Sequence, residues 1–184
     1  IFNSVTGNWW PSDQGVKVVP CVYHKTYVEW APVGSGAKGP VAVHQSKDVM
    51  NNTVRGDDSK YYTNDNSGNY IEETANYFVL IIGGKGETSQ AVISMKSSQL
   101  TPSKIKNSEG VHFTPPMWSH SYLLKSEKTK NGDKTWYKWK IEVDSMLSNE
   151  AQVKEARSFS EEMALAKDKL VPDMEEKQND KTPF

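Results

Sequence analysis

The chain has 184 residues, a formal net charge of -1 and a mean hydropathy of -0.69, values that allow one domain with an appendage and exclude a uniformly basic protein. No apolar run approaches the ~20 residues of a membrane span, so we expect no membrane partner. The single cysteine, Cys21, cannot form an internal disulfide, which excludes a disulfide scaffold and makes the cytoplasm the expected location.

The first predicted strand spans residues 16–30. Because side chains alternate between the two faces of a strand, Tyr23, Lys25 and Tyr27 share one face. Aromatic rings stack on bases and an ammonium group pairs with a phosphate, so this face is a candidate nucleic-acid contact. Pro20 lacks a backbone donor and predicts an edge position or a bulge early in the strand.

Residues 31–69 are mostly polar and contain one short predicted strand, near residues 41–44. The Gly- and Pro-rich residues 32–40 are typical of a loop. Residues 45–69 are rich in Asp, Asn, Ser and Gly, and we expect them to form a long, mobile excursion on the surface.

A central strand is predicted within residues 70–82, because its Tyr-Phe-Val-Leu-Ile-Ile run is apolar on both faces. Gly-rich residues 83–86 turn the chain into a partner strand, so residues 75–96 predict a β-hairpin. A short helix can then open at Ser97. Lysine and serine side chains are common phosphate contacts, and this region has several serines together with Lys96, Lys104 and Lys106.

Residues 119–130 and 134–143 predict a second hairpin, because Asn131-Gly132 between them is a strong turn signal. Within it, residues 134–140 have three aromatic rings and three lysines. Alternation divides this stretch between the two faces of the strand. The more apolar face, which we expect to face the core, has Tyr137, Trp139, Ile141 and Val143.

The opposite face has Trp136, Lys138 and Lys140 and is the main candidate contact for a single strand. A base stacked on Trp136 would contribute about 1–3 kcal/mol, and the lysines would bind phosphates. Residues 90–147 have nine lysines and five acidic residues, a net charge of +4. In the alternative interpretation Trp136 covers a hydrophobic patch under a helix, with the lysine stems packed around it.

A long helix is predicted after residue 148, where the period of the apolar residues becomes helical. Ser148 is the predicted N-cap, and Pro172 ends the helix. The apolar stripe of the helix is Ala156, Phe159, Met163, Ala166 and Leu170. Residues 172–184 have too few hydrophobic residues to fold alone, and we expect a flexible acidic tail.

Together these elements predict a mainly β fold: an OB-fold-like antiparallel barrel with a long C-terminal helix and a polar acidic tail. The expected division is an OB-like β domain over residues 1–147, the helix over residues 148–171 and the tail over residues 172–184. Such barrels bind single strands across one face.

Acidic pairs offer an enzymatic interpretation, because Asp57-Asp58 and Glu72-Glu73 could bind a divalent metal ion. Paired acids in polar loops are usually only solvated, and the histidines lie far apart in the chain. The chain also lacks the frame of a nucleophile elbow and the spacing of a P-loop. We therefore expect a protein that is not an enzyme and has no metal or cofactor. A nuclease that uses Asp57, Asp58 or Glu72 is a third hypothesis.

The last residues form an acidic segment that ends in Thr182-Pro183-Phe184. This end resembles the C-terminal tip of bacterial single-stranded DNA-binding proteins, in which an acidic tail ends in Pro-Phe. The resemblance implies that Phe184, with Asp180 and Pro183, docks on replication or recombination proteins. It also implies that the tail competes with DNA for the binding face. Lys181 departs from the pattern, because those families have acidic residues there.

Four segments resemble a family of small tailed-phage proteins, namely residues 27–32, 91–100, 113–120 and 136–137. The resemblance covers about residues 16–165 and implies a phage origin. In those relatives the stretch after residue 100 tends to be strongly basic, and Lys104 and Lys106 stand there in this chain. Some of these phage proteins are thought of as single-stranded DNA binders.

The leading hypothesis is therefore a phage protein that binds single-stranded DNA without strong sequence preference in replication or recombination, by base stacking and phosphate contacts. The alternative is a structural protein of the virion or of its assembly, because Trp and Tyr also suit protein interfaces. The host cytoplasm is the expected location, and the sequence is compatible with a homo-oligomer. The candidate contacts are Tyr23, Lys25, Tyr27, Lys96, Lys104, Lys106, Trp136, Lys138 and Lys140.

Overall fold

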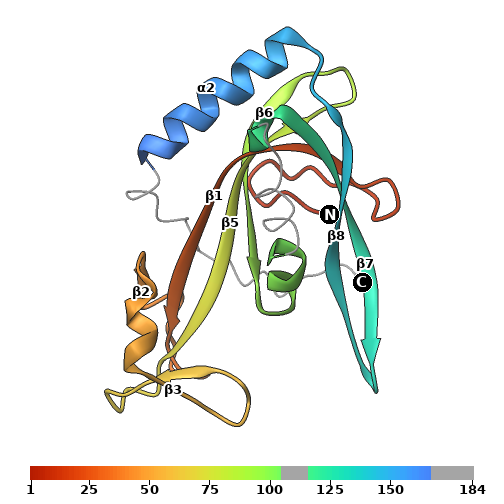
Figure 1. Ribbon diagram of the computed structural model, residues 1–184. Coiled ribbons are helices and arrows are strands. Elements are labelled where there is room, and N and C mark those ends of the chain that lie inside the picture. The colour runs from red at the N-terminus through yellow and green to blue at the C-terminus, as the bar shows by residue number, and fades with distance from the viewer. Residues whose placement is uncertain (105–115, 167–184) are drawn as a thin grey trace. The chain divides into compact units, whose positions relative to one another are not determined.

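The computed structural model describes residues 1–104 and 116–166 (Figure 1). The fold is mainly β, with a curled antiparallel sheet of the OB-like kind and a helix, α2 (Glu150–Ala166), toward the C-terminus. This confirms the predicted fold class. The tail predicted over residues 172–184 lies outside the described residues.

Within the described residues, eight strands form one sheet in the order β3-β4-β5-β1-β7-β8, with β2 paired to β1 and β6 paired to β5. The first four strands are β1 (Val16–Trp30), β2 (Ala42–His44), β3 (Thr53–Arg55) and β4 (Tyr61–Thr63). The others are β5 (Tyr70–Ile82), β6 (Thr88–Lys96), β7 (His120–Asn131) and β8 (Lys134–Met146). The predicted long strands and both predicted hairpins are therefore confirmed.

The chain divides into two compact units, and the division passes through two of the strands. Unit 1 contains residues 1–24 and the described residues from Ala75 onward, and unit 2 contains residues 25–74. Unit 1 holds a hydrophobic core, to which β5 supplies Ala75, Tyr77, Val79 and Ile81. Residues 74–81 are buried without interruption, as expected for a central strand.

Residues 45–69, expected to form a long mobile excursion, contain regular secondary structure. This segment contains the 3-10 helix η1 (Lys47–Asn52) and strands β3 and β4. The Ser46 hydroxyl caps η1 by accepting from the Asp48 amide at 3.1 Å. Both strands are three residues long, too short to show the alternation by which a strand is recognised in a sequence.

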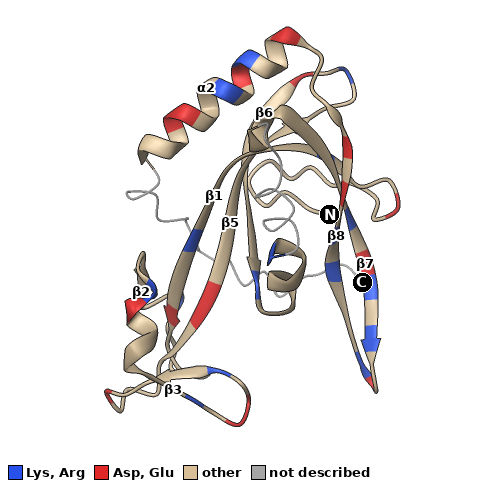
Figure 2. Ribbon diagram, viewed as in Figure 1, with Lys and Arg blue, Asp and Glu red and all other residues tan. Residues whose placement is uncertain are grey.

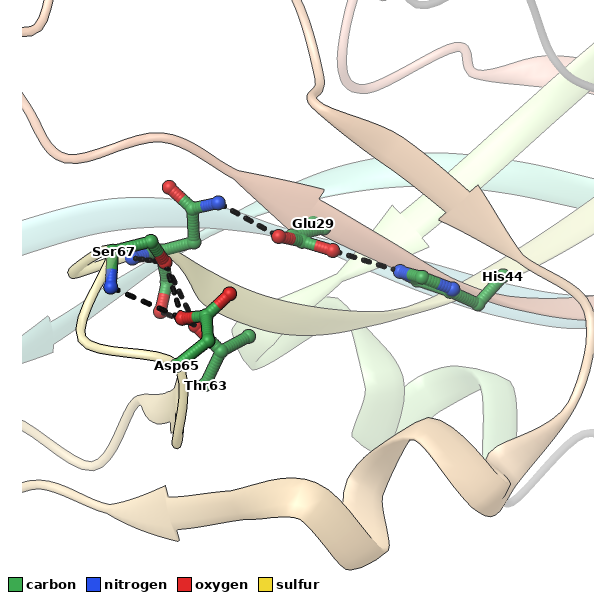
Figure 3. A network of polar contacts seen from close by, with 6 residues as sticks. Glu29, His44, Thr63, Asp65 and Ser67 are labelled. Atoms are coloured by element: carbon green, nitrogen blue, oxygen red, sulfur yellow. Dashed lines mark hydrogen bonds and ion pairs between the residues drawn. The ribbon is translucent and has the colours of Figure 1, made fainter.

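Polar side chains hold the segments of unit 2 together (Figure 3). The Glu29 carboxylate lies 2.9 Å from Nε2 of His44 and accepts from the Asn69 amide at 2.7 Å. Asp65 accepts from the hydroxyls of Ser67 and Thr63, and these bonds lower the pKa of Asp65 to about 2. A turn of polar residues is thereby fixed without a large apolar cluster.

Helix α2 belongs to unit 1 and packs there through Ala156 and Phe159, which are buried as predicted. Its N-cap is Asn149 rather than Ser148, because the Asn149 side-chain oxygen accepts from the backbone amides of Ala151 and Gln152. The Ser160 hydroxyl donates to the carbonyl oxygen of Cys21 at 3.0 Å and ties the helix to β1. Leu170 and Pro172 lie outside the described residues.

Candidate nucleic-acid interface

The β7–β8 hairpin positions the aromatic and basic side chains of residues 134–140. Its strands pair from His120 opposite Met146 to Asn131 opposite Lys134. The two-residue loop is therefore Gly132-Asp133, with Gly132 at φ +59 in the first loop position, as in a type II′ turn. The hairpin was predicted correctly, but its loop begins one residue later than Asn131-Gly132, because Asn131 belongs to the ladder.

One face of this hairpin, here called the groove face, has the three residues that the sequence singled out. In the ladder Trp136 lies opposite Thr129, Lys138 opposite Glu127, and Lys140 opposite Lys125. Trp136, Lys138 and Lys140 line an open depression of about 420 Å³. Ser98, Thr101 and Pro102 form its other wall, and Trp139 and Ile141 line it as well.

Two contacts fix this second wall beside β8. The Gln99 side-chain amide donates to the carbonyl oxygen of Tyr137 at 2.7 Å, and its oxygen accepts from the amide of Trp139 at 2.7 Å. Four residues after Gln99, the buried hydroxyl of Ser103 lies 2.9 Å from the Tyr77 hydroxyl in the core. Gln99 thus occupies the place of a neighbouring strand along the edge of β8.

The structure therefore brings together two stretches that the sequence treated separately, the serine- and lysine-rich segment after β6 and the groove face. Lys96 ends β6 and is partly buried, whereas Lys104 is exposed. Lys106 lies outside the described residues. Sequence reasoning missed this link, because a glutamine that bonds to a strand edge looks like any surface glutamine.

Carboxylates accompany the lysines of the groove face. Lys138 lies 3.5 Å from Glu127, and Glu142 lies 2.9 Å from Lys140 and 3.1 Å from Lys125. Hydrogen bonds from Lys140 and Lys125 lower the pKa of Glu142, and the bond with Glu142 raises the pKa of Lys140. These ion pairs are exposed and contribute little to stability, so a phosphate can displace the carboxylate at small cost.

The opposite face of the hairpin corrects one prediction and confirms another. Trp139 and Ile141 pack against the hydrophobic core of unit 1, as predicted. Tyr137 and Val143, predicted to face the core, are 58% and 53% exposed. Tyr137 lies near the loop, opposite the exposed Lys128, where the ribbon extends past the core and has solvent on this face.

The face of β1 with Tyr23, Lys25 and Tyr27 is not an open surface. The Tyr23 ring packs 5.1 Å from the ring of Tyr77, and Tyr27 is only 4% exposed. Lys25 forms an ion pair with Glu73 at 2.9 Å. The alternation was read correctly, but β1 is largely covered on both sides, since its neighbours Thr26 and Val28 are also buried. A base could stack on Tyr27 only after the strand had been uncovered.

The acidic pairs do not gather into a metal site. In residues 1–104 and 116–166, no three His, Cys, Asp or Glu side chains are placed to hold a metal ion together. Asp58 instead accepts from the Tyr62 hydroxyl at 2.8 Å, which lowers the pKa of Asp58. The same described residues contain no helix long and apolar enough to cross a membrane. The tail residues Asp180, Pro183 and Phe184 lie outside them.

Comparison with known proteins places the chain among phage proteins. Residues 1–169 match the model of a family described as Pam3 phage gp34-like protein. No curated protein and no solved structure matches the chain.

Proposed function

The chain belongs to the Pam3 phage gp34-like family, and we propose that this phage protein binds single-stranded DNA, without strong sequence preference, in replication or recombination. The observation that supports this best is the groove face. There a tryptophan and two lysines, Trp136, Lys138 and Lys140, line one depression with the hydroxyl-bearing wall at Ser98 and Thr101. The proposal is a binding protein and requires no catalytic residue.

Binding combines stacking with exchange of ion pairs. One base stacks on the ring of Trp136, which contributes about 1–3 kcal/mol. Phosphates replace Glu127 and Glu142 as partners of Lys138 and Lys140. Two phosphate contacts to a single strand give a slope of roughly -1.4 in a plot of log affinity against log salt. The proposed affinity is therefore modest and sensitive to salt.

Fluorescence anisotropy with labelled oligo-dT at low salt tests the proposal. The full chain should bind at micromolar concentration, and Trp136→Ala should weaken binding by about 5- to 150-fold. Trp9→Ala is the matched control, because Trp9 is 71% exposed and does not line the depression. If the unaltered chain shows no binding at micromolar protein, the proposal is wrong.

The tail adds a proposed partner contact. We propose that Asp180, Pro183 and Phe184 bind replication or recombination proteins, and that the acidic tail competes with DNA for the lysines of the groove face. This rests on the sequence of the tail alone. Removal of residues 171–184 should tighten oligo-dT binding, and looser or unchanged binding would contradict competition.

A second candidate function is a structural role in the virion or its assembly, and the outermost strand β8 favours it. β8 ends the strand order, and it has two large exposed apolar residues, Val143 and Met146, at 53% and 63%. An exposed sheet edge with apolar side chains suits pairing with another protein chain. Mass spectrometry of purified particles separates the two functions, because a replication protein should be absent from them.

A further inference from the structure

The face of the β7–β8 hairpin opposite the groove has its own aromatic and basic side chains near the loop, here called the arm patch: Tyr137, Lys128 and Lys130. Lys128 lies directly opposite Tyr137 in the ladder. Lys130 is two residues farther along β7, on the same face and nearer the loop. All three are exposed, and Tyr137 by 58%. Figure 2 shows basic residues on both strands toward this end of the hairpin.

The arm patch differs from the groove face in its charge balance. Within the described residues, neither Lys128 nor Lys130 has a carboxylate within 4.0 Å. Glu127, the neighbour of Lys128 in the chain, points to the other face and pairs with Lys138. Residues 125–140 have six lysines and two acidic residues, a net charge of +4. These two ammonium groups are therefore available to an anion without breaking an ion pair.

We infer that the arm patch is a second contact for single-stranded nucleic acid, so that one hairpin holds two segments of strand and bridges them. This inference rests on the function proposed for the groove face. The Tyr137 ring presents a surface for one base, and the two lysines, about 7 Å apart along the strand, bind phosphates of the same segment.

The alternation of the strand makes the contact a bridge rather than an extension of the groove. Trp136 and Tyr137 are consecutive, so their rings leave β8 on opposite faces. Bases on the two rings lie on either side of the ribbon and belong to different strands or to distant parts of one strand. Because the arm patch has one ring and no second wall, it binds more weakly than the groove face.

Two measurements on the full chain test this inference. Anisotropy with one labelled oligo-dT reports binding to a single strand. Energy transfer between donor-labelled and acceptor-labelled oligo-dT, which cannot pair with each other, reports bridging. The patch variant is Lys128→Gln/Lys130→Gln/Tyr137→Ser, and the control Lys85→Gln/Lys154→Gln removes the same charge from exposed positions elsewhere.

We expect the unaltered chain and the control to bind and to bridge. The patch variant should bind single oligo-dT within about three-fold of the unaltered chain, and its energy transfer should fall at least five-fold. Its melting curve should match that of the unaltered chain, since the three side chains are exposed. Trp136→Ala should instead lose affinity for the single oligonucleotide.

Each other result overturns the inference in a recognisable way. If the unaltered chain binds oligo-dT without energy transfer, bridging is wrong and the proposed function stands. If it does not bind at all, the proposed function fails and the bridge fails with it. If bridging persists in the patch variant, another surface is responsible for it. If bridging is lost equally in the control, it depends on the total positive charge rather than on the arm patch.

Discussion

Gln99 provides a sharp test of how the groove is built, because one side chain fixes the second wall to the edge of β8. Its amide group makes two hydrogen bonds of 2.7 Å, one to the carbonyl oxygen of Tyr137 and one from the amide of Trp139. Gln99→Ala removes both. Gln99→Glu keeps an acceptor for the Trp139 amide and loses the donor to Tyr137 at neutral pH.

The expected cost follows from the number of bonds and their exposure. A neutral hydrogen bond contributes about 0.5–1.5 kcal/mol net. Tyr137 is exposed and Gln99 partly so, and water can replace the lost partners. We therefore expect Gln99→Ala to lower the free energy that protects this edge by about 1–2 kcal/mol, which corresponds to exchange of the Trp139 amide about 5- to 30-fold faster.

Hydrogen exchange followed by NMR reads this out directly at the Trp139 amide. The amide of Leu80, in the buried strand β5, is the internal reference and should not change. Gln99→Glu should show a smaller effect at pH 7. Below about pH 4 its protonated carboxyl can donate to Tyr137 again, and protection of the edge should return.

Unchanged exchange at Trp139 in Gln99→Ala would refute the assignment of Gln99 as the anchor of this edge. Loss of protection at both Trp139 and Leu80 would contradict it as well, because the substitution would then destabilise the whole unit rather than one edge. Failure of acid to restore protection in Gln99→Glu would show that the bond to Tyr137 does not contribute.

Four further outcomes follow from the structure. Trp139→Ala should lower the free energy of unfolding in urea by about 2–3 kcal/mol, less than for a fully buried tryptophan because Trp139 is partly exposed, whereas Trp136→Ala should change it little. Glu142→Gln should tighten oligo-dT binding about three-fold by anisotropy, since the Glu142 carboxylate pairs with Lys140 and would repel a phosphate that binds there. Burial raises the pKa of Cys21 to about 12, so alkylation of the native protein at pH 8 should be at least ~100-fold slower than alkylation in urea. The free energy of unfolding should also fall as pH rises above about 9, because only the thiol of the unfolded chain ionises there. Hydrogen bonds from Lys17, Ser121 and Ser145 lower the pKa of Asp144 to about 2. Asp144→Asn should therefore lower the free energy of unfolding by about 1 kcal/mol at neutral pH. This difference between the two proteins should vanish as pH falls from about 4 toward 2.

The elements found from the sequence are those with a long, regular pattern. β5 is apolar on both faces, the hairpin has a strong turn signal, and α2 has an apolar stripe, so each was located before the structure. β3 and β4 were missed because three residues cannot show a period. The N-cap was displaced to Asn149 because Ser148 and Asn149 are both good caps, and only the geometry distinguishes them.

The candidate site was only partly predictable, for a different reason. Alternation assigns side chains to two faces but does not say where along a strand the core ends. Trp139 and Tyr137 share a face, yet one packs on the core and the other lies beyond it. Distance from the hairpin loop was the signal that could have separated them. For Tyr27, no local pattern shows that β1 is covered on this side, because coverage depends on segments far away in the chain.

The chain path through the two units has a consequence for folding. In the described part of the chain, unit 2 is one uninterrupted stretch of 50 residues, 25–74, whereas unit 1 is assembled from the stretches before and after it. The parts of β1 and β5 that belong to unit 1 can meet only when the ends of that stretch come together. For a flexible chain of this length, the length-dependent free-energy cost of closing the loop is roughly 3.5 kcal/mol. Local structure formed early in residues 25–74 shortens the loop and lowers this barrier. The polar contacts of Glu29 with His44 and Asn69 thus bear on how fast the core of unit 1 assembles.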